Sequence, residues 1–220
     1  YKADYKIERP FQLVTHDTLL ARTHSQLAEV GELETTYAFQ INDRREFDII
    51  RGVSRRAQFN FELRSHTFDA TLQHTPVPLG SKTRLEGLSG ISGMLQENVY
   101  RGVPLLSDYR SFGGGVFALE RLIIGNVELE AGVRYDHETR QAYVPKKTYQ
   151  SLVREDRIEV DQCAVLETRS RCRSKFHAGT VSLGSLVRIS EAFLAKLDLS
   201  SATRMPTIDE QYINGTSPSF

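Results

Sequence analysis

The chain has 220 residues, of which 40% are hydrophobic, and its 28 Lys and Arg are balanced by 28 Asp and Glu. This hydrophobic fraction is enough for a buried core or for a lipid-facing surface. The balanced charge excludes the overall positive field of a typical nucleic-acid binder, so no nucleic acid is expected as a partner. No window approaches the roughly 18 to 20 apolar residues of a membrane helix, so a bilayer could be crossed only by strands.

Alternation of apolar and polar residues, typical of a strand with two different faces, recurs along the chain. In one segment Leu33, Thr35, Tyr37, Phe39 and Ile41 share a face, and Glu34, Thr36, Ala38 and Gln40 share the other. A helical pattern is nowhere sustained. The predicted strands, in chain order, are 17–28, 33–42, 66–75, 83–96, 111–124, 127–139, 176–188 and 193–203.

The apolar residues of segment 57–63 are out of phase with Phe68, Ala70 and Leu72 in the strand that follows. This phase change predicts the top of a strand followed by a β-bulge.

The predicted connections alternate in length. Short ones are expected at 29–32, 76–82, the two-residue turn Gly125-Asn126, and 189–192, and long ones at 43–65, 97–110 and 140–175. All the long loops therefore fall at one end of the strands, which favours an all-β, antiparallel, up-and-down transmembrane β-barrel. A soluble β-sandwich or a lipocalin-like barrel is the alternative.

Cys163 and Cys172 lie close together in a polar stretch that offers too few Cys and His for a structural metal site. A local disulfide in an oxidising compartment is expected, with two free thiols as the alternative. The six histidines are scattered, and only His137 and His177, on adjacent predicted strands, are expected to approach each other.

The sequence contains no catalytic motif, so we expect neither an enzyme nor a cofactor. The run Gly113-Gly114-Gly115 lies within a strand pattern, which predicts a close backbone approach or a bend rather than a phosphate loop.

Four segments resemble TonB-dependent outer-membrane receptors. They are 33–47 (LETTYAFQINDRREF), 89–117 (with SGISGMLQEN and DYRSFGGGVF), 128–137 (ELEAGVRYDH) and 200–215 (SSATRMPTIDEQYING). The last is similar to the family's "RxPTxxELYxNG" signature, although Gln211 stands where the family usually has Leu. From the residues alone, Arg204 and Pro206 are expected to end a strand, because Pro206 has no N–H for the ladder, and the segment then serves as a loop anchor.

This resemblance implies about eight strands of a 22-strand barrel in a bacterial outer membrane. Residues 1–220 are then part of one barrel domain, with the plug domain and the barrel C-terminus outside the chain. The implied activity is import of a nutrient, most often a ferric siderophore, with haem, zinc and cobalamin as other substrates. The implied partners are the TonB complex, acting through the plug, the metal-chelate ligand, and outer-membrane lipid.

The predicted long loops, which would face the cell exterior, hold cations and aromatic residues suited to an anionic, aromatic ligand. The predicted ligand-binding residues are Arg101, Tyr109, Arg110, Tyr149 and Arg154, with Tyr143, Lys146 and Lys147 nearby. The alternative for each is a residue that keeps the loop hydrated. A passive porin or adhesin-type barrel, or a soluble β-sandwich binding module, is the competing function.

Overall fold

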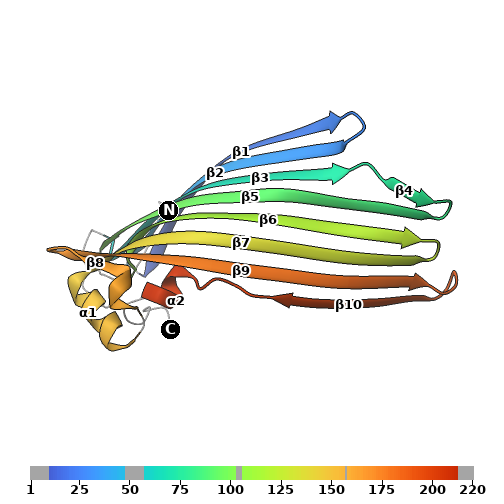
Figure 1. Cartoon of the computed structure of the whole chain (residues 1–220). Coiled ribbons are helices and arrows are strands. Elements are labelled where there is room, and N and C mark those ends of the chain that lie inside the picture. Colours follow the sequence, from blue (N-terminus) through green and yellow to red (C-terminus); the bar gives the residue numbers. More distant parts are fainter. Residues whose placement is uncertain (1–9, 48–56, 103–105, 157, 213–220) are drawn as a thin grey trace, which may run out of the picture.

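A computed structural model describes residues 10–47, 57–102, 106–156 and 158–212. It is an open antiparallel sheet in which sequence neighbours pair in the order β1-β2-β3-β5-β6-β7-β9-β10 (Figure 1). The strands are β1 (Phe11–Leu27), β2 (Gly31–Phe47), β3 (Phe59–His74), β4 (Val77–Gly80), β5 (Thr83–Gly102), β6 (Asp108–Ile124), β7 (Val127–Pro145), β8 (Cys163–Val165), β9 (Arg169–Arg188) and β10 (Leu194–Ala202). The antiparallel, up-and-down part of the predicted fold is thus confirmed.

The hairpin turns lie at one end of the sheet and the loops at the other, here called the turn end and the loop end (Figure 1). At the turn end, the predicted two-residue turn is present between β6 and β7. Gly125 has a φ of 58°, in the left-handed region, as a type II′ turn requires of its first central residue. Neighbouring turns are tied together, since Gly125 N donates to Lys82 O and Arg188 N donates to Asn126 O, both at 2.9 Å.

One face of the sheet, here called the apolar face, is lined by exposed hydrophobic side chains on every strand of the main path. Its register places these residues on the same side. Between 38% and 63% of each is exposed, and they include Leu19, Tyr37, Phe68, Ile91, Val116, Val133, Leu183 and Leu199. This continuous surface is far larger than the scattered apolar residues of an ordinary protein surface.

The opposite face, here called the polar face, carries ion pairs within and between strands. They include Arg22–Glu34, Arg84–Glu86, Arg121–Glu130, Arg134–Asp136, Arg140–Glu138 and Lys196–Asp198. Each long strand therefore has one apolar and one polar face, as its period of two predicts.

All eight predicted strands are present, but seven of them extend further toward the loop end than predicted. β7 continues to Pro145 instead of residue 139, and β9 begins at Arg169 instead of residue 176. The predicted boundaries were wrong because near the loops the outward side of the sheet carries polar residues, while apolar residues such as Ala142 and Val144 lie on the polar face instead. The predicted long loop 97–110 is reduced to the connection between Gly102 and Asp108.

The predicted bulge in segment 57–63 is also wrong. β3 keeps an unbroken register against both neighbours from Phe59 onward. Phe59, Phe61 and Leu63 point to the polar face, and Phe59 is 1% exposed. The apolar residues change phase in the sequence because at the loop end the polar face is the covered one. No residue is inserted into the strand.

The core lies at the loop end, on the polar face. The connection between β7 and β9 contains helix α1 (Lys146–Arg154), the 3₁₀ turn η1 (Val160–Gln162) and β8, and helix α2 (Ile208–Tyr212) follows β10 (Figure 1). Their side chains join those of β6, β7 and β9 in one buried cluster: Tyr109, Ala142, Val144, Tyr149, Leu152, Ile158, Cys172 and Tyr212. No helix among the described residues is long and apolar enough to cross a membrane.

The glycine run predicted to allow close approach lies within β6. A Cβ built on Gly115 would collide with Asp136 Oδ1 and approach Arg134, whereas one built on Gly93, on β5, would meet nothing within 4 Å. We therefore expect Gly115→Val to lower the free energy of unfolding by about 1–3 kcal/mol, since it overpacks the Arg134–Asp136 pair. Gly93→Ala is the matched control. Equal urea midpoints for the two variants would contradict this account of the glycine run.

Candidate functional site

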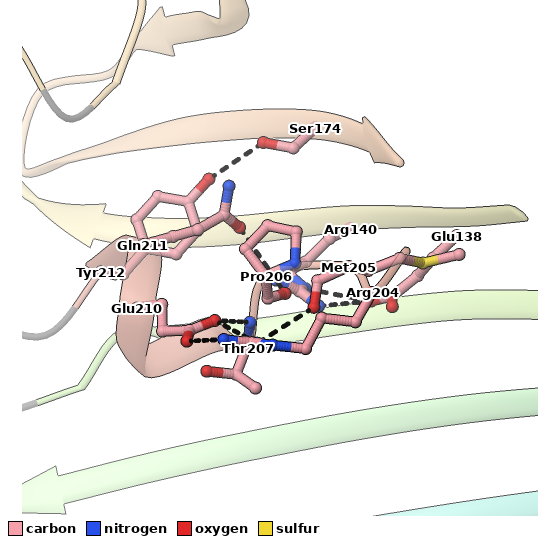
Figure 2. A network of polar contacts seen from close by, with 10 residues as sticks. All are labelled: Glu138, Arg140, Ser174, Arg204, Met205, Pro206, Thr207, Glu210, Gln211 and Tyr212. Atoms are coloured by element: carbon pink, nitrogen blue, oxygen red, sulfur yellow. Dashed lines mark hydrogen bonds and ion pairs between the residues drawn. The ribbon is translucent and has the colours of Figure 1, made fainter. Parts of the chain in front are cut away.

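The segment that leaves β10 turns onto the polar face, and contacts among its own residues fix its shape (Figure 2). Arg204 forms an ion pair with Glu210, with Nη1 2.8 Å from Oε2. The Thr207 backbone N–H donates to the same carboxylate at 2.7 Å. These two donors hold the pKa of Glu210 down, at about 2 instead of 4.5. These contacts join Arg204, Thr207 and Glu210 into a closed ring. The segment 204–212, which contains this ring, is here called the anchor, after the loop anchor that the sequence predicts.

Arg140, on β7, connects this anchor to the sheet. Its guanidinium donates to Glu138 Oε1 at 2.8 and 3.0 Å, to Pro206 O at 3.0 Å and to Gln211 Oε1 at 2.9 Å. Phe176 lies beneath it, with the ring centroid 5.0 Å from the Arg140 Cζ. The side chains of Arg140 and Glu138 are only 7% and 11% exposed, so this ion pair is shielded from water. Figure 2 shows the guanidinium between β7 and the returning segment.

Tyr212 completes the attachment. Its hydroxyl lies 3.2 Å from Ser174 Oγ of β9, and its ring enters the buried cluster that also contains Tyr109 and Tyr149. Burial raises the pKa of both Tyr212 and Tyr109 above the usual value of 10. Both phenols are therefore neutral at physiological pH.

Beside this anchor is an open hollow of about 410 Å³ on the polar face. Arg134 and Asp136 form its floor, and Arg134 Nη2 also donates to Ser92 Oγ at 2.9 Å. Asp69 and Glu138 add carboxylates to its lining, and Arg204 lies at its rim. The hollow thus presents both signs of charge, beside apolar residues such as Met94 and Met205.

The predicted ligand-binding residues do not converge. Tyr109 and Tyr149 are each 8% exposed inside the buried cluster. Arg101 and Arg110 project from the face opposite to that cluster, and Arg110 is bound to Glu97 at 2.7 Å. Arg154 is exposed at the end of α1. The ligand role of these five residues stays a prediction.

The two cysteines are joined by a disulfide that connects β8 to β9. Cys172 is 1% exposed and belongs to the buried cluster. The cross-link therefore holds the loop that carries α1 against the sheet.

His137 and His177 face each other across β7 and β9, with ring centroids 4.6 Å apart. Tyr135 hydrogen-bonds to His177 Nδ1. Within the described residues, no three His, Cys, Asp or Glu side chains gather as a metal-binding group. The pair lies on the same side as the apolar face, between that face and the loop end.

The sequence analysis missed the central residue of the network. Glu138 lies within the predicted strand 127–139 and Arg140 at the start of the predicted loop 140–175, although Glu138, Arg140, Ala142 and Val144 alternate as the covered face of a strand. Gln211, noted only as a departure from the resembled motif, accepts a hydrogen bond from Arg140.

We expect Arg140→Met to release the anchor, because it leaves the Glu138 carboxylate shielded and without its partner. The loss should be about 3–5 kcal/mol in the free energy of unfolding, with faster tryptic cleavage after Arg204. The control is Arg121→Met, which removes an exposed ion pair with Glu130 and should change stability by less than about 1 kcal/mol. Unchanged cleavage in Arg140→Met would refute the proposed attachment.

The anchor is also expected to respond to acid. Because the pKa of Glu210 is lower in the folded protein than its ordinary 4.5, its contribution is complete above about pH 4.5 and disappears as pH falls through about 2. Hydrogen exchange of the Thr207 amide should therefore stay protected at pH 4 and lose protection toward pH 2, relative to the intrinsic rate. In Glu210→Gln that protection should already be reduced at pH 7, and full protection there would count against the ion-pair ring.

Comparison with known proteins adds no relative. No protein-family model matches this chain, and no curated protein matches it significantly.

Proposed function

We propose that the chain is an arc of a bacterial outer-membrane β-barrel belonging to a TonB-dependent receptor, which imports a metal chelate such as a ferric siderophore. The observation that carries the membrane part is the two-faced sheet. Exposed apolar residues cover one face of all eight strands of the main path, and ion pairs occupy the other. Lipid would cover the first face and the aqueous lumen would hydrate the second.

The dimensions of the apolar face support this proposal. On β7 it runs from Val127 to Tyr135, about 27 Å along the strand at about 3.4 Å per residue. A tilt of roughly 40° reduces this to a height of about 20 Å, close to the roughly 25 Å apolar band of outer-membrane barrels. Two tyrosine–histidine pairs, Tyr37 with His66 and Tyr135 with His177, lie where the apolar face ends toward the loop end. Amphipathic rings at this height suit a membrane interface.

A soluble β-sandwich is less consistent with the same surface, because its apolar face would pack against a second sheet. Among the described residues, the apolar face carries no covering element, and Leu183 and Leu199 remain more than 60% exposed. Edge groups on β1 and β10 would pair with the remaining strands of a closed barrel.

The receptor assignment, in preference to a passive porin or adhesin-type barrel, is supported by the four motif segments. The segment most similar to the family signature folds onto the side proposed as the lumen, where Arg140 binds it. In this proposal the loop end faces the cell exterior, and the turn end, with Gly125 and Asn126, faces the periplasm. The plug and the TonB complex would supply energised release of the ligand.

Two experiments test the proposal in order. If the full-length protein partitions into aqueous buffer without detergent, the membrane assignment fails.

A deletion strain is then compared with its parent on defined iron-siderophore, haem or zinc sources. Loss of growth on one source at limiting concentration, restored by the gene, supports energised import. Growth unaffected on every source would favour the passive barrel.

A pair of adjacent substitutions tests which face meets lipid. Val181, on the apolar face of β9, is 55% exposed, and Ser182 points to the polar face. Val181→Arg should lower the stability of the protein folded in a bilayer by about 2–4 kcal/mol. Ser182→Arg, with its side chain in the aqueous lumen, should have a much smaller effect. Equal effects in bilayer refolding titrations would contradict the assignment of the faces.

A further inference from the structure

The loop end of β9 carries a row of cations on the same side as the apolar face. Arg169, Arg171, Arg173 and Lys175 alternate with Ser170, Cys172, Ser174 and Phe176. The four cations are exposed, and the first three of the alternate residues are buried. Arg171, Arg173 and Lys175 are here called the basic ladder.

The basic ladder differs from three other cations on this side of the sheet. Arg45, Arg64 and Arg110 are each paired with a carboxylate, of Asp43, Glu62 and Glu97 respectively. Across β7, the ladder faces Tyr143, Gln141 and Thr139, and no carboxylate. Within the part of the chain that the structure describes, no ion pair joins the ladder to a carboxylate.

Three carboxylates lie near the ladder at the sheet edge. Asp156, Glu159 and Asp161 line an open hollow of about 700 Å³ together with Arg173 and Lys175, outside ion-pair distance. On the β7 side no carboxylate faces the ladder, and there the hydroxyl of Tyr143 accepts from Gln141 Nε2 at 2.6 Å. Arg169 is held over the Tyr143 ring, 4.9 Å from its centroid. An anion would therefore meet the ladder from the β7 side.

The position of the ladder relative to the apolar face gives the chemistry of its ligand. Along β9 the cations are followed by His177, then by Val181 and Leu183 of the apolar face. Alternate residues of a strand are about 6.6 Å apart, so the three cations span about 13 Å. Lys175, the nearest of them, is about 13 Å along β9 from Gly179, which pairs with Tyr135 at the end of the apolar face. A molecule that matches this order has an anionic head and apolar chains.

We propose that the basic ladder binds the phosphate groups of a lipid whose chains lie along the apolar face of β7 and β9. This inference rests on the proposed membrane placement of the sheet. Arginine binds phosphate oxygens in a bidentate manner, and the lysine adds a third positive charge. The Tyr135 and His177 pair lies between head and chains, at the depth where polar aromatic rings contact a lipid interface.

The test compares phosphatidic acid with diacylglycerol of the same chains, added to the full-length protein in a neutral detergent, with bound lipids counted by native mass spectrometry. The wild-type protein should bind phosphatidic acid at least about tenfold more tightly than diacylglycerol. The triple variant Arg171→Gln, Arg173→Gln, Lys175→Gln should lower that affinity by up to about a hundredfold at low salt. The matched control, Arg45→Gln, Arg64→Gln, Arg110→Gln, removes three carboxylate-paired cations from the same side and should change it less than about threefold.

Equal losses in the two triple variants would overturn the proposal in favour of a diffuse electrostatic effect, as would unchanged binding in the ladder variant. Displacement of the lipid by millimolar inorganic phosphate would also overturn it, in favour of a site for free phosphate. Failure of the membrane placement gives a different result, a protein that needs no detergent. A protein that stays folded in detergent but shows no preference for phosphatidic acid refutes the lipid site alone.

Discussion

Continuous backbone pairing across the sheet determines the placement of almost every other feature. Each long strand is hydrogen-bonded to its sequence neighbour without a register shift along the main path. Because side chains alternate with a period of two, one residue of slippage would exchange the two faces of a strand. The register therefore fixes together the apolar face, the ion pairs of the polar face, the position of Arg140 beneath the returning segment, and the alignment of the basic ladder.

The loop end shows how the same register supports two environments on one strand. In β9, Cys172 and Ser174 face a packed cluster while Arg171 and Arg173 face outward, and further along the strand Val181 faces outward among apolar residues. One unbroken register thus gives a covered polar side near the loops and an exposed apolar side nearer the turns. The disulfide and the Arg140 contacts, both at the loop end, attach the loop and the returning segment to this rigid frame.

Strand order, pairing direction and the two-residue turn at Gly125 could be predicted from the sequence, because alternation and turn chemistry are local signals. The loop ends of the strands could not, because residues such as Arg169 and Arg173 are polar on the outward side and give no apolar alternation. The error in segment 57–63 has the same origin, since a change of covered face resembles an inserted residue in the sequence. The contacts of Arg140 with Pro206 and Gln211 join residues far apart in the chain, so no local pattern could predict them.

The sequential strand order also bears on how the sheet is assembled. Every strand of the main path pairs with the next strand of that path, with only the short β4 and β8 inserted between partners, so the contacts are made between segments that are close in sequence. Hairpins of this kind close loops of low entropic cost and form quickly compared with pairings between distant segments. The sheet can therefore grow by adding one hairpin at a time to an exposed edge. Among the described residues, β1 and β10 are the two edges of the sheet, so each offers a row of backbone groups on which a further strand could pair.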